Sequence, residues 1–137
     1  MFSLGQKSLE RLSTVKPNLQ AVVKRAIEIS KVDFRVIEGI RTAERQAYLL
    51  QKGATRTRNS KHLTGDAVDL APIIDGQVSW DWKYFHPIAE AMKEASEELD
   101  IPIRWGGTWL PLHVTTPTNG KFALSKTFPD GPHFELL

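Results

Sequence analysis

The chain reads Ser60-Lys61-His62-Leu63-Thr64-Gly65-Asp66-Ala67-Val68-Asp69-Leu70-Ala71 near its middle, which places a histidine and an aspartate seven positions apart around a glycine. Gly65 supplies a flexible backbone point, and the small and branched residues of 67–71 are typical of a buried strand. We expect the strand to hold Asp69 rigidly and the preceding loop to fold His62 back over the same point. An imidazole nitrogen and a carboxylate oxygen that converge in this way suit zinc. The stretch therefore predicts half of a metal site.

A second candidate ligand in this stretch is Asp66. It lies three residues before Asp69, and because side chains alternate along a strand, it should point to the opposite face. The prediction therefore takes Asp69 as the ligand.

The rest of the site is expected in the last residues of the chain, Asp130-Gly131-Pro132-His133-Phe134-Glu135-Leu136. His133 begins a strand directly after a Gly-Pro turn, and a strand projects alternate residues to one face, so His133 and Glu135 share a side. His62, Asp69 and His133 together give three ligands and leave a fourth position for water, as in a catalytic zinc site. Either histidine taken alone is more often a packing or hydrogen-bonding residue; their two contexts together favour ligation.

Two further residues carry predicted catalytic roles. Asp130 is expected to be the general base that guides water onto a carbonyl carbon, with Glu135 as its rival or as a hydrogen-bond partner of a metal ligand. An Asp before Gly is also common in plain turns. Arg41 lies at a strand-to-helix junction, where its guanidinium could stabilise an oxyanion or bind a substrate carboxylate. The alternative for Arg41 is a surface salt bridge with Glu38 or Glu44.

Hydrophobic spacing and turn residues predict the elements around these positions. Helices are expected over 7–14, from Pro17 through Ile27, between the cap Thr42 and Gly53, and from near Pro87 to Leu99. Strands are expected at 34–38, 67–71, 73–78 (a hairpin with an Asp-Gly turn), 101–105 and at the C-terminus. The result is an α+β fold, with helices packed on one side of a small, mainly antiparallel sheet whose central strands carry Asp69 and His133.

The segment Thr108 to Phe128 is rich in Pro, Thr, Gly and Asn. It is longer than most irregular connections, which predicts a functional loop that borders the site. Trp105 and Trp109 flank Gly106-Gly107; such residues are more often core, although one could form a wall of the cleft.

Composition narrows the function classes. The 137 residues, 41% hydrophobic and 25% charged, fit one catalytic domain over 1–137 without a separate cell-wall-binding domain. A net charge of +2 gives no reason to expect nucleic-acid binding. Lys52, Arg56, Arg58 and Lys61 could favour an anionic substrate, although a solvated basic loop is the commoner explanation. The chain has no cysteine, so a metal site must use His, Asp and Glu.

The N-terminal residues lack the apolar core of a signal peptide, and the sequence has no apolar run long enough to cross a bilayer. We therefore expect a monomer that is made in the cytoplasm, has no stable membrane association and reaches any outside target by another route.

These motifs resemble a known family. The pattern Ser60-x-His62-x-x-Gly65-x-Ala67-x-Asp69, with Gly39-Ile40-Arg41 before it and Trp105-Gly106-Gly107-x-Trp109 and the C-terminal motif after it, is similar to that of the LAS-type zinc peptidases of peptidoglycan. These share the fold of Hedgehog and the D-Ala-D-Ala peptidases. The resemblance is closest to single-domain phage endolysins of the L-alanyl-D-glutamate peptidase type, and it extends from about Leu12 to the C-terminus.

The resemblance implies specific roles. It assigns zinc binding to His62, Asp69 and His133, the catalytic base to Asp130 and stabilisation of the reacting carbonyl to Arg41. It implies a phage endolysin that cuts peptidoglycan stem peptides between L-Ala and D-Glu. Such an enzyme would stay in the host cytoplasm until lysis and then act in the periplasm, released through a holin. The alternatives are a D-alanyl-D-alanine carboxypeptidase that uses the same metal site and a non-catalytic zinc-containing binding domain.

Overall fold

The computed structural model describes residues 1–55, 57 and 60–137. Two arginines of the basic loop, Arg56 and Arg58, lie outside the described residues. The prediction that this loop favours anionic substrates therefore stays a prediction.

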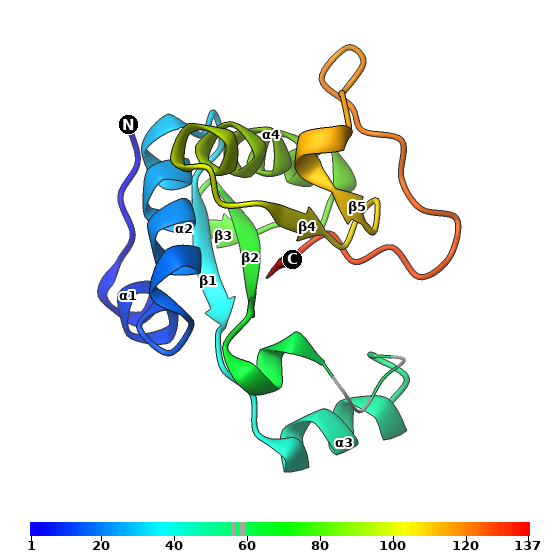
Figure 1. Cartoon of the computed structure of the whole chain (residues 1–137). Helices are drawn as coiled ribbons and strands as arrows, with labels where there is room; N and C mark the ends of the chain where they lie inside the picture. Colours follow the sequence, from blue (N-terminus) through cyan, green and yellow to red (C-terminus); the bar gives the residue numbers. More distant parts are fainter. Residues whose placement is uncertain (56, 58–59) are drawn as a thin grey trace.

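The sheet is antiparallel throughout and contains β1 (Phe34–Glu38), β2 (Ala67–Ile74), β4 (Ile103–Trp105), β5 (Leu110–Pro111) and β6 (His133–Leu136). Their order is β1-β2-β6-β4-β5, and the short β3 (Gln77–Val78) pairs with the end of β2 (Figure 1). The α+β fold with a small antiparallel sheet is confirmed. Its central strands β2 and β6 lie side by side, with Asp69 directly opposite His133.

Strand β2 continues three residues beyond its predicted end. Ala67, Val68, Leu70 and Ala71 are fully buried, which explains why small and branched residues fill this strand. The hairpin after it has the predicted Asp-Gly turn, in which Asp75 and Gly76 take φ values of 53° and 80°. Two consecutive positive φ values are typical of the tight turns that match strand twist.

Among the described residues, four α-helices accompany the sheet: α1 (Gln6–Leu12), α2 (Pro17–Ile29), α3 (Ala43–Gln51) and α4 (Trp82–Leu99). Pro17 opens α2, as expected. The predicted start of α4 near Pro87 is wrong, because the helix begins at Trp82 with Asp81 as its cap and contains Pro87 within it. The missing amide hydrogen of a proline is tolerated at a helix start. For this reason the predicted start of the helix, near Pro87, lies five residues too late.

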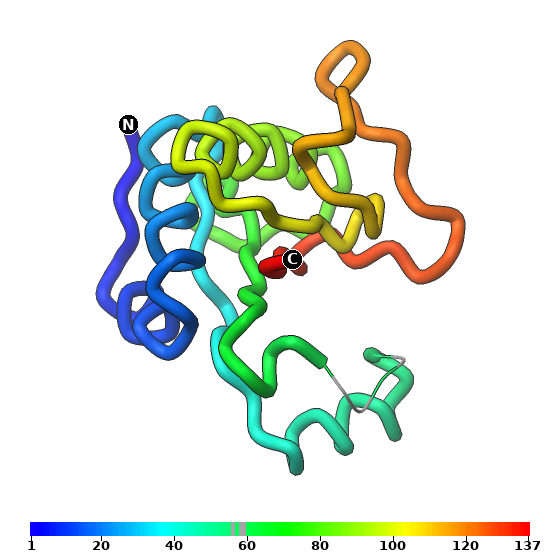
Figure 2. The backbone as a smooth tube through the Cα atoms, viewed as in Figure 1, coloured from blue at the N-terminus to red at the C-terminus, as the bar shows by residue number. Residues whose placement is uncertain are grey.

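Helices α2 and α4 pack against each other, and α4 also contacts β2 and β4. The largest fully buried side chains of the core between helices and sheet are those of Trp105, Phe34 and Phe134. Helix α3 lies away from this layer, beyond one end of the sheet (Figure 1). The segment 108–128 is the yellow to orange tube in Figure 2. It begins with the edge strand β5 and the short 3-10 helix η2 (Leu112–Val114) and then extends away from the sheet.

Helices of the described residues are all too short or too polar to span a bilayer.

Candidate active site

A cavity of about 760 Å³ opens where the ends of β1, β2 and β6 meet the loops around them. One wall comes from α3 and the residues after it, and the opposite wall comes from Trp80, Trp109, Thr127 and Phe128. His62, Asp69, Asp130, His133, Arg41 and Glu135 all line this cavity. The structure thus gathers every residue for which the sequence predicted a metal-binding or catalytic role, although these residues lie far apart in the chain, from Arg41 to Glu135.

His62 reaches the cavity from a short 3-10 helix, η1 (Lys61–Thr64). The Ser60 hydroxyl accepts a hydrogen bond from the His62 amide at 3.1 Å, and Gly65 ends the helix with a φ of 75°. This conformation favours glycine, so the glycine turns the chain from η1 into β2. The His62 ring then contacts Gly39: its Nδ1 donates to the Gly39 carbonyl at 2.9 Å. Because a carbonyl can only accept, Nδ1 carries the hydrogen and Nε2 points into the cavity with a lone pair.

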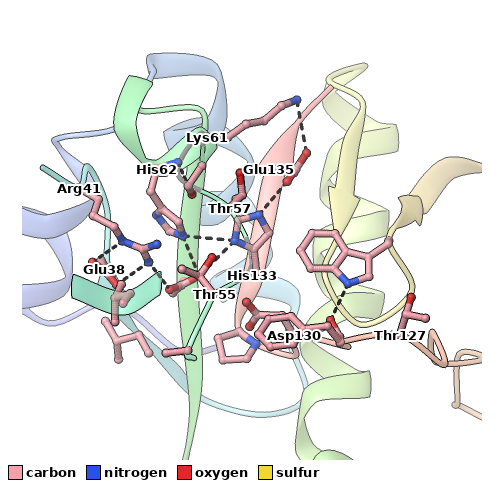
Figure 3. A pocket seen from close by; sticks show the side chains of 18 of the residues that line it. Glu38, Arg41, Thr55, Thr57, Lys61, His62, Thr127, Asp130, His133 and Glu135 are labelled. Carbon is pink, nitrogen blue, oxygen red and sulfur yellow. Dashed lines mark hydrogen bonds and ion pairs between the residues drawn. The ribbon is translucent and has the colours of Figure 1, made fainter. Parts of the chain in front are cut away.

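His133 shows the same arrangement on the other side. Its Nε2 donates to the Glu135 carboxylate at 2.8 Å, which leaves Nδ1 facing the cavity. His133 Nδ1 lies 3.2 Å from His62 Nε2 (Figure 3). The Oδ1 of Asp69 lies 3.5 Å from His133 Nδ1 and 3.0 Å from His62 Nε2.

Three acceptor atoms therefore converge, one from each of His62, Asp69 and His133. The far nitrogens of both rings are committed as donors, so the near atoms repel one another unless a proton or a cation lies between them. These atoms all lie within 4.8 Å of one another, so the group could hold a metal ion. The donor set of two imidazoles and one carboxylate leaves room in a tetrahedral coordination for one more ligand.

The charges of the group follow from the same contacts. Burial favours a raised pKa for Asp69, but the hydrogen bonds with His133 and His62 outweigh it and hold the pKa below its usual range. Burial would lower the pKa of His133, yet its hydrogen bonds with Asp69 and Glu135 raise that pKa to about 9. A group that attracts a proton this strongly also attracts a metal cation, which competes for the same lone pairs.

Asp130 lies beside this group, in the turn before β6. Burial, with a further contribution from the charge of Asp69, raises the pKa of Asp130 to about 6. Among the described residues its carboxylate has no hydrogen-bond partner, so it remains available to a substrate or water. The turn is fixed by Gly106, whose amide donates to the His133 carbonyl at 2.8 Å and whose carbonyl accepts from the Asp130 amide at 2.9 Å.

Arg41 lies behind the group and is almost fully buried. Its Nε and Nη2 donate to the two carboxylate oxygens of Glu38 at 2.8 Å, and Nη2 also reaches Asp69 at 3.4 Å. Nη1 donates to Gln46 at 2.7 Å. The ion pair with Glu38 that the sequence left open is present, but it is partly buried rather than on the surface, and it extends to Asp69. Within the part of the chain that the structure describes, four of the five guanidinium hydrogens have partners, which leaves one on Nη1 for a ligand.

The remaining sequence candidates are distributed as follows. Asp66 pairs with Lys16 at 2.9 Å and with Thr64, away from the cavity. Trp105 is core, whereas Trp109 forms part of the wall, with its ring 5.3 Å from that of His133. Of the four histidines, His86 belongs to the aromatic core and His113 is exposed.

Several residues of the site were missed from the sequence. Gln46 is a buried polar residue of α3, and it also bonds to Thr55 and Thr57 in the cavity wall. Trp80 is a further residue of the opposite wall that was missed, whereas Thr127 and Phe128 belong to the segment 108–128, which was expected to border the site and does so. A glutamine five residues after Arg41, one helical turn into α3, was the one local signal that could have identified Gln46.

Comparisons with known proteins agree with this geometry. A protein-family model described as phage L-alanyl-D-glutamate peptidase matches residues 1–137. The chain is 41% identical to an L-alanyl-D-glutamate peptidase of Escherichia phage T5, over 99% of this chain and 98% of that protein. It is 26% identical to an L-alanyl-D-glutamate peptidase of Listeria phage A118, over 75% of this chain but 37% of that protein. The crystal structure of Serratia marcescens L-Ala D-Glu endopeptidase ChiX superposes with a TM-score of 0.80 and 39% identity, covering 96% of this chain and 87% of that one.

Proposed function

Because this chain belongs to the phage L-alanyl-D-glutamate peptidase family, we propose that it is a zinc-dependent endolysin that hydrolyses the L-Ala-D-Glu bond of peptidoglycan stem peptides. The observation that carries the zinc is the convergence of His62 Nε2, Asp69 Oδ1 and His133 Nδ1, while the other nitrogen of each ring binds an acceptor on its far side. Family membership supports the peptide bond, and the donor set supports the metal.

The proposed ligands are His62, Asp69 and His133. Bound there, zinc would polarise the scissile carbonyl and lower the pKa of water to about 7. The chain contributes rigid positions for this chemistry: Gly39 fixes the His62 ring, and the antiparallel pairing of β2 with β6 places Asp69 opposite His133.

Asp130 is the proposed general base. It receives the proton of the attacking water and passes it to the amine of the leaving D-Glu, as a carboxylate in this position does in general acid-base catalysis. Its exposure to the cavity and its lack of a described partner support this role. Arg41 is proposed to use its remaining Nη1 hydrogen to bind the carbonyl oxygen, where negative charge develops.

The proposal also covers where the enzyme works. Peptidoglycan lies outside the cytoplasmic membrane, so we propose that the monomeric enzyme waits in the host cytoplasm and acts in the periplasm after lysis begins. The domain formed by residues 1–137 would bind the stem peptide through the cavity. Fractionation of infected cells before and after lysis, with sacculus digestion as readout, tests the location.

Metal analysis of the protein purified without chelator tests the site. We expect about one zinc per chain, loss of sacculus digestion after chelation and recovery on adding zinc. The same three-ligand set binds iron(II) in oxygenases, so iron in place of zinc would contradict the assignment.

A matched pair of variants sharpens this test. Asp69→Asn should lose zinc, whereas Asp66→Asn, three residues away and paired to Lys16, should keep it. Equal zinc in both variants would remove Asp69 from the ligand set.

A further inference from the structure

The buried carboxylate of Glu135 has no assigned task in the reaction proposed above. Glu135 follows His133 by two residues on β6, so both side chains lie on one side of the strand, and both are buried. Its Oε1 lies 2.8 Å from His133 Nε2. The carboxylate therefore contacts the edge of the imidazole opposite to the Nδ1 that faces His62 and Asp69.

The second carboxylate oxygen is held by two cations from other elements. Glu135 Oε2 lies 3.4 Å from Lys61 Nζ and 3.6 Å from Arg104 Nη1. Arg104 is opposite Glu135 in the pairing of β4 with β6, and Lys61 immediately precedes His62 in η1. Lys61 also donates to the Leu136 carbonyl. Glu135 is thus fixed on both sides, as Figure 3 shows for Lys61 and His133.

This arrangement determines the ring orientation of His133, with Nε2 toward Glu135 and Nδ1 toward His62 and Asp69. A carboxylate accepts hydrogen bonds only, so the Nε2 of His133 must carry a hydrogen, and Nδ1 is the nitrogen that can exchange its proton for a metal ion. The hydrogen bond also prevents the ring from flipping, because a flipped ring would lose this partner. The side chains of Lys61 and Arg104 are partly exposed, and they supply the positive charge beside the buried Glu135 carboxylate.

Resting on the zinc site proposed above, we propose that Glu135 is a positioning residue: held by Lys61 and Arg104, it fixes His133 with Nδ1 toward the metal. Partners of this kind orient metal-bound histidines and raise their basicity. The same placement argues against Glu135 as the catalytic base, since its carboxylate bonds to the far edge of the ring and both oxygens are engaged.

Zinc affinity, measured by competition with a fluorescent chelator, tests the proposal. We expect Glu135→Ala to weaken zinc binding by about 10- to 100-fold. Glu135→Gln keeps an acceptor for Nε2 but brings an NH₂ group to the two cations, so its loss should be intermediate. Glu98→Ala removes a carboxylate that pairs with Arg25 on the exposed face of α4 and should bind zinc like the wild type.

Nitrogen-15 NMR of the zinc-loaded protein supplies a second readout that a packing defect would not change. In the wild type the Nε2 hydrogen of His133 should be protected from exchange with water, and in Glu135→Ala it should be lost to exchange. If Glu135→Ala does not fold, as judged by circular dichroism, Glu135→Gln carries the test. Zinc affinity of the folded variant within twofold of the wild type, with the Nε2 signal retained, would overturn the proposal and leave the zinc site intact. Failure of the wild type itself to bind zinc would instead overturn the zinc assignment, and this inference with it.

Discussion

Each imidazole of the metal group is oriented by one acceptor on its far side, the Gly39 carbonyl for His62 and Glu135 for His133. These hydrogen bonds decide which nitrogen faces the cavity, and they do so before any ligand arrives. Preorganisation of this kind means that binding does not have to pay for ordering the rings. The residues behind the ligands therefore set the orientation of both rings.

Asp130→Asn tests the proposed base. The amide has nearly the same shape but cannot accept a proton from water, so we expect activity on purified sacculi to fall by about 100-fold or more. Zinc content should stay at the wild-type level, because Asp130 is not a proposed ligand. Loss of zinc together with activity would contradict the division of roles, and retained activity would remove Asp130 from the mechanism.

Gly106→Ala tests the packing that fixes the Asp130 turn. A Cβ at this position would lie 2.4 Å from the Asp130 carbonyl oxygen and 3.0 Å from the Cβ atoms of Asp130 and His133. We expect a loss of about 1–3 kcal/mol in the free energy of unfolding and a large loss of activity. Gly5→Ala, with no atom within 4 Å of the added Cβ, is the control. Wild-type activity in Gly106→Ala would show that the turn tolerates displacement.

At the scale of elements, the pairing of β2 with β6 brings Asp69 next to His133 across more than sixty residues of sequence. The sequence predicted both strands, because alternation and buried small residues are local signals. It could not predict that β6 lies between β2 and β4, because strand order depends on long-range packing that leaves no local pattern. Gln46 was missed as a partner of Arg41 for the same reason, because it is an ordinary polar residue until the fold buries it. Glu38 was expected as a partner, but only in a surface salt bridge.

Helix α4 is connected to the loop after β5 by His86, whose Nδ1 accepts a hydrogen bond from the Phe122 amide at 3.1 Å. Burial, together with the nearby charge of Lys121, lowers the pKa of His86 below 6.5, although Glu90 acts in the opposite direction. At a pH between this lowered pKa and 6.5, His86 is protonated in the unfolded chain but not in the folded protein. This contribution to stability is therefore present above about pH 6.5 and is lost as the pH falls.

Urea unfolding of the wild type and His86→Gln, at about pH 7.5 and about pH 5.5, measures this effect. Glutamine keeps an acceptor for the Phe122 amide but does not titrate. We expect the wild type to lose more stability than the variant on acidification. The other titrating groups are common to both proteins, so the difference reports on His86. If both proteins lost the same stability, His86 would take up its proton as readily in the folded protein as in the unfolded chain, which would contradict the lowered pKa.

For the molecule as a whole, the proposed zinc ligands come from η1, β2 and β6, so a bound ion would link elements that are distant in sequence. A ligand that binds only the folded state stabilises it by about 2.7 kcal/mol at a concentration of 100 times its Kd. We expect zinc to raise the Tm of the chelator-treated protein by several degrees. Asp69→Asn should lose most of this shift, and an equal shift in both proteins would indicate binding elsewhere.

The central proposal is that this molecule hydrolyses the bond between L-Ala and D-Glu with a zinc ion held by the proposed ligands. Digestion of purified sacculi by the zinc-loaded protein, followed by mass spectrometry of the products, tests it most directly. We expect stem peptides that begin with D-Glu, glycan strands that keep L-Ala, and no products after chelation. Release of terminal D-Ala alone, or the same products from the chelated protein, would contradict the account.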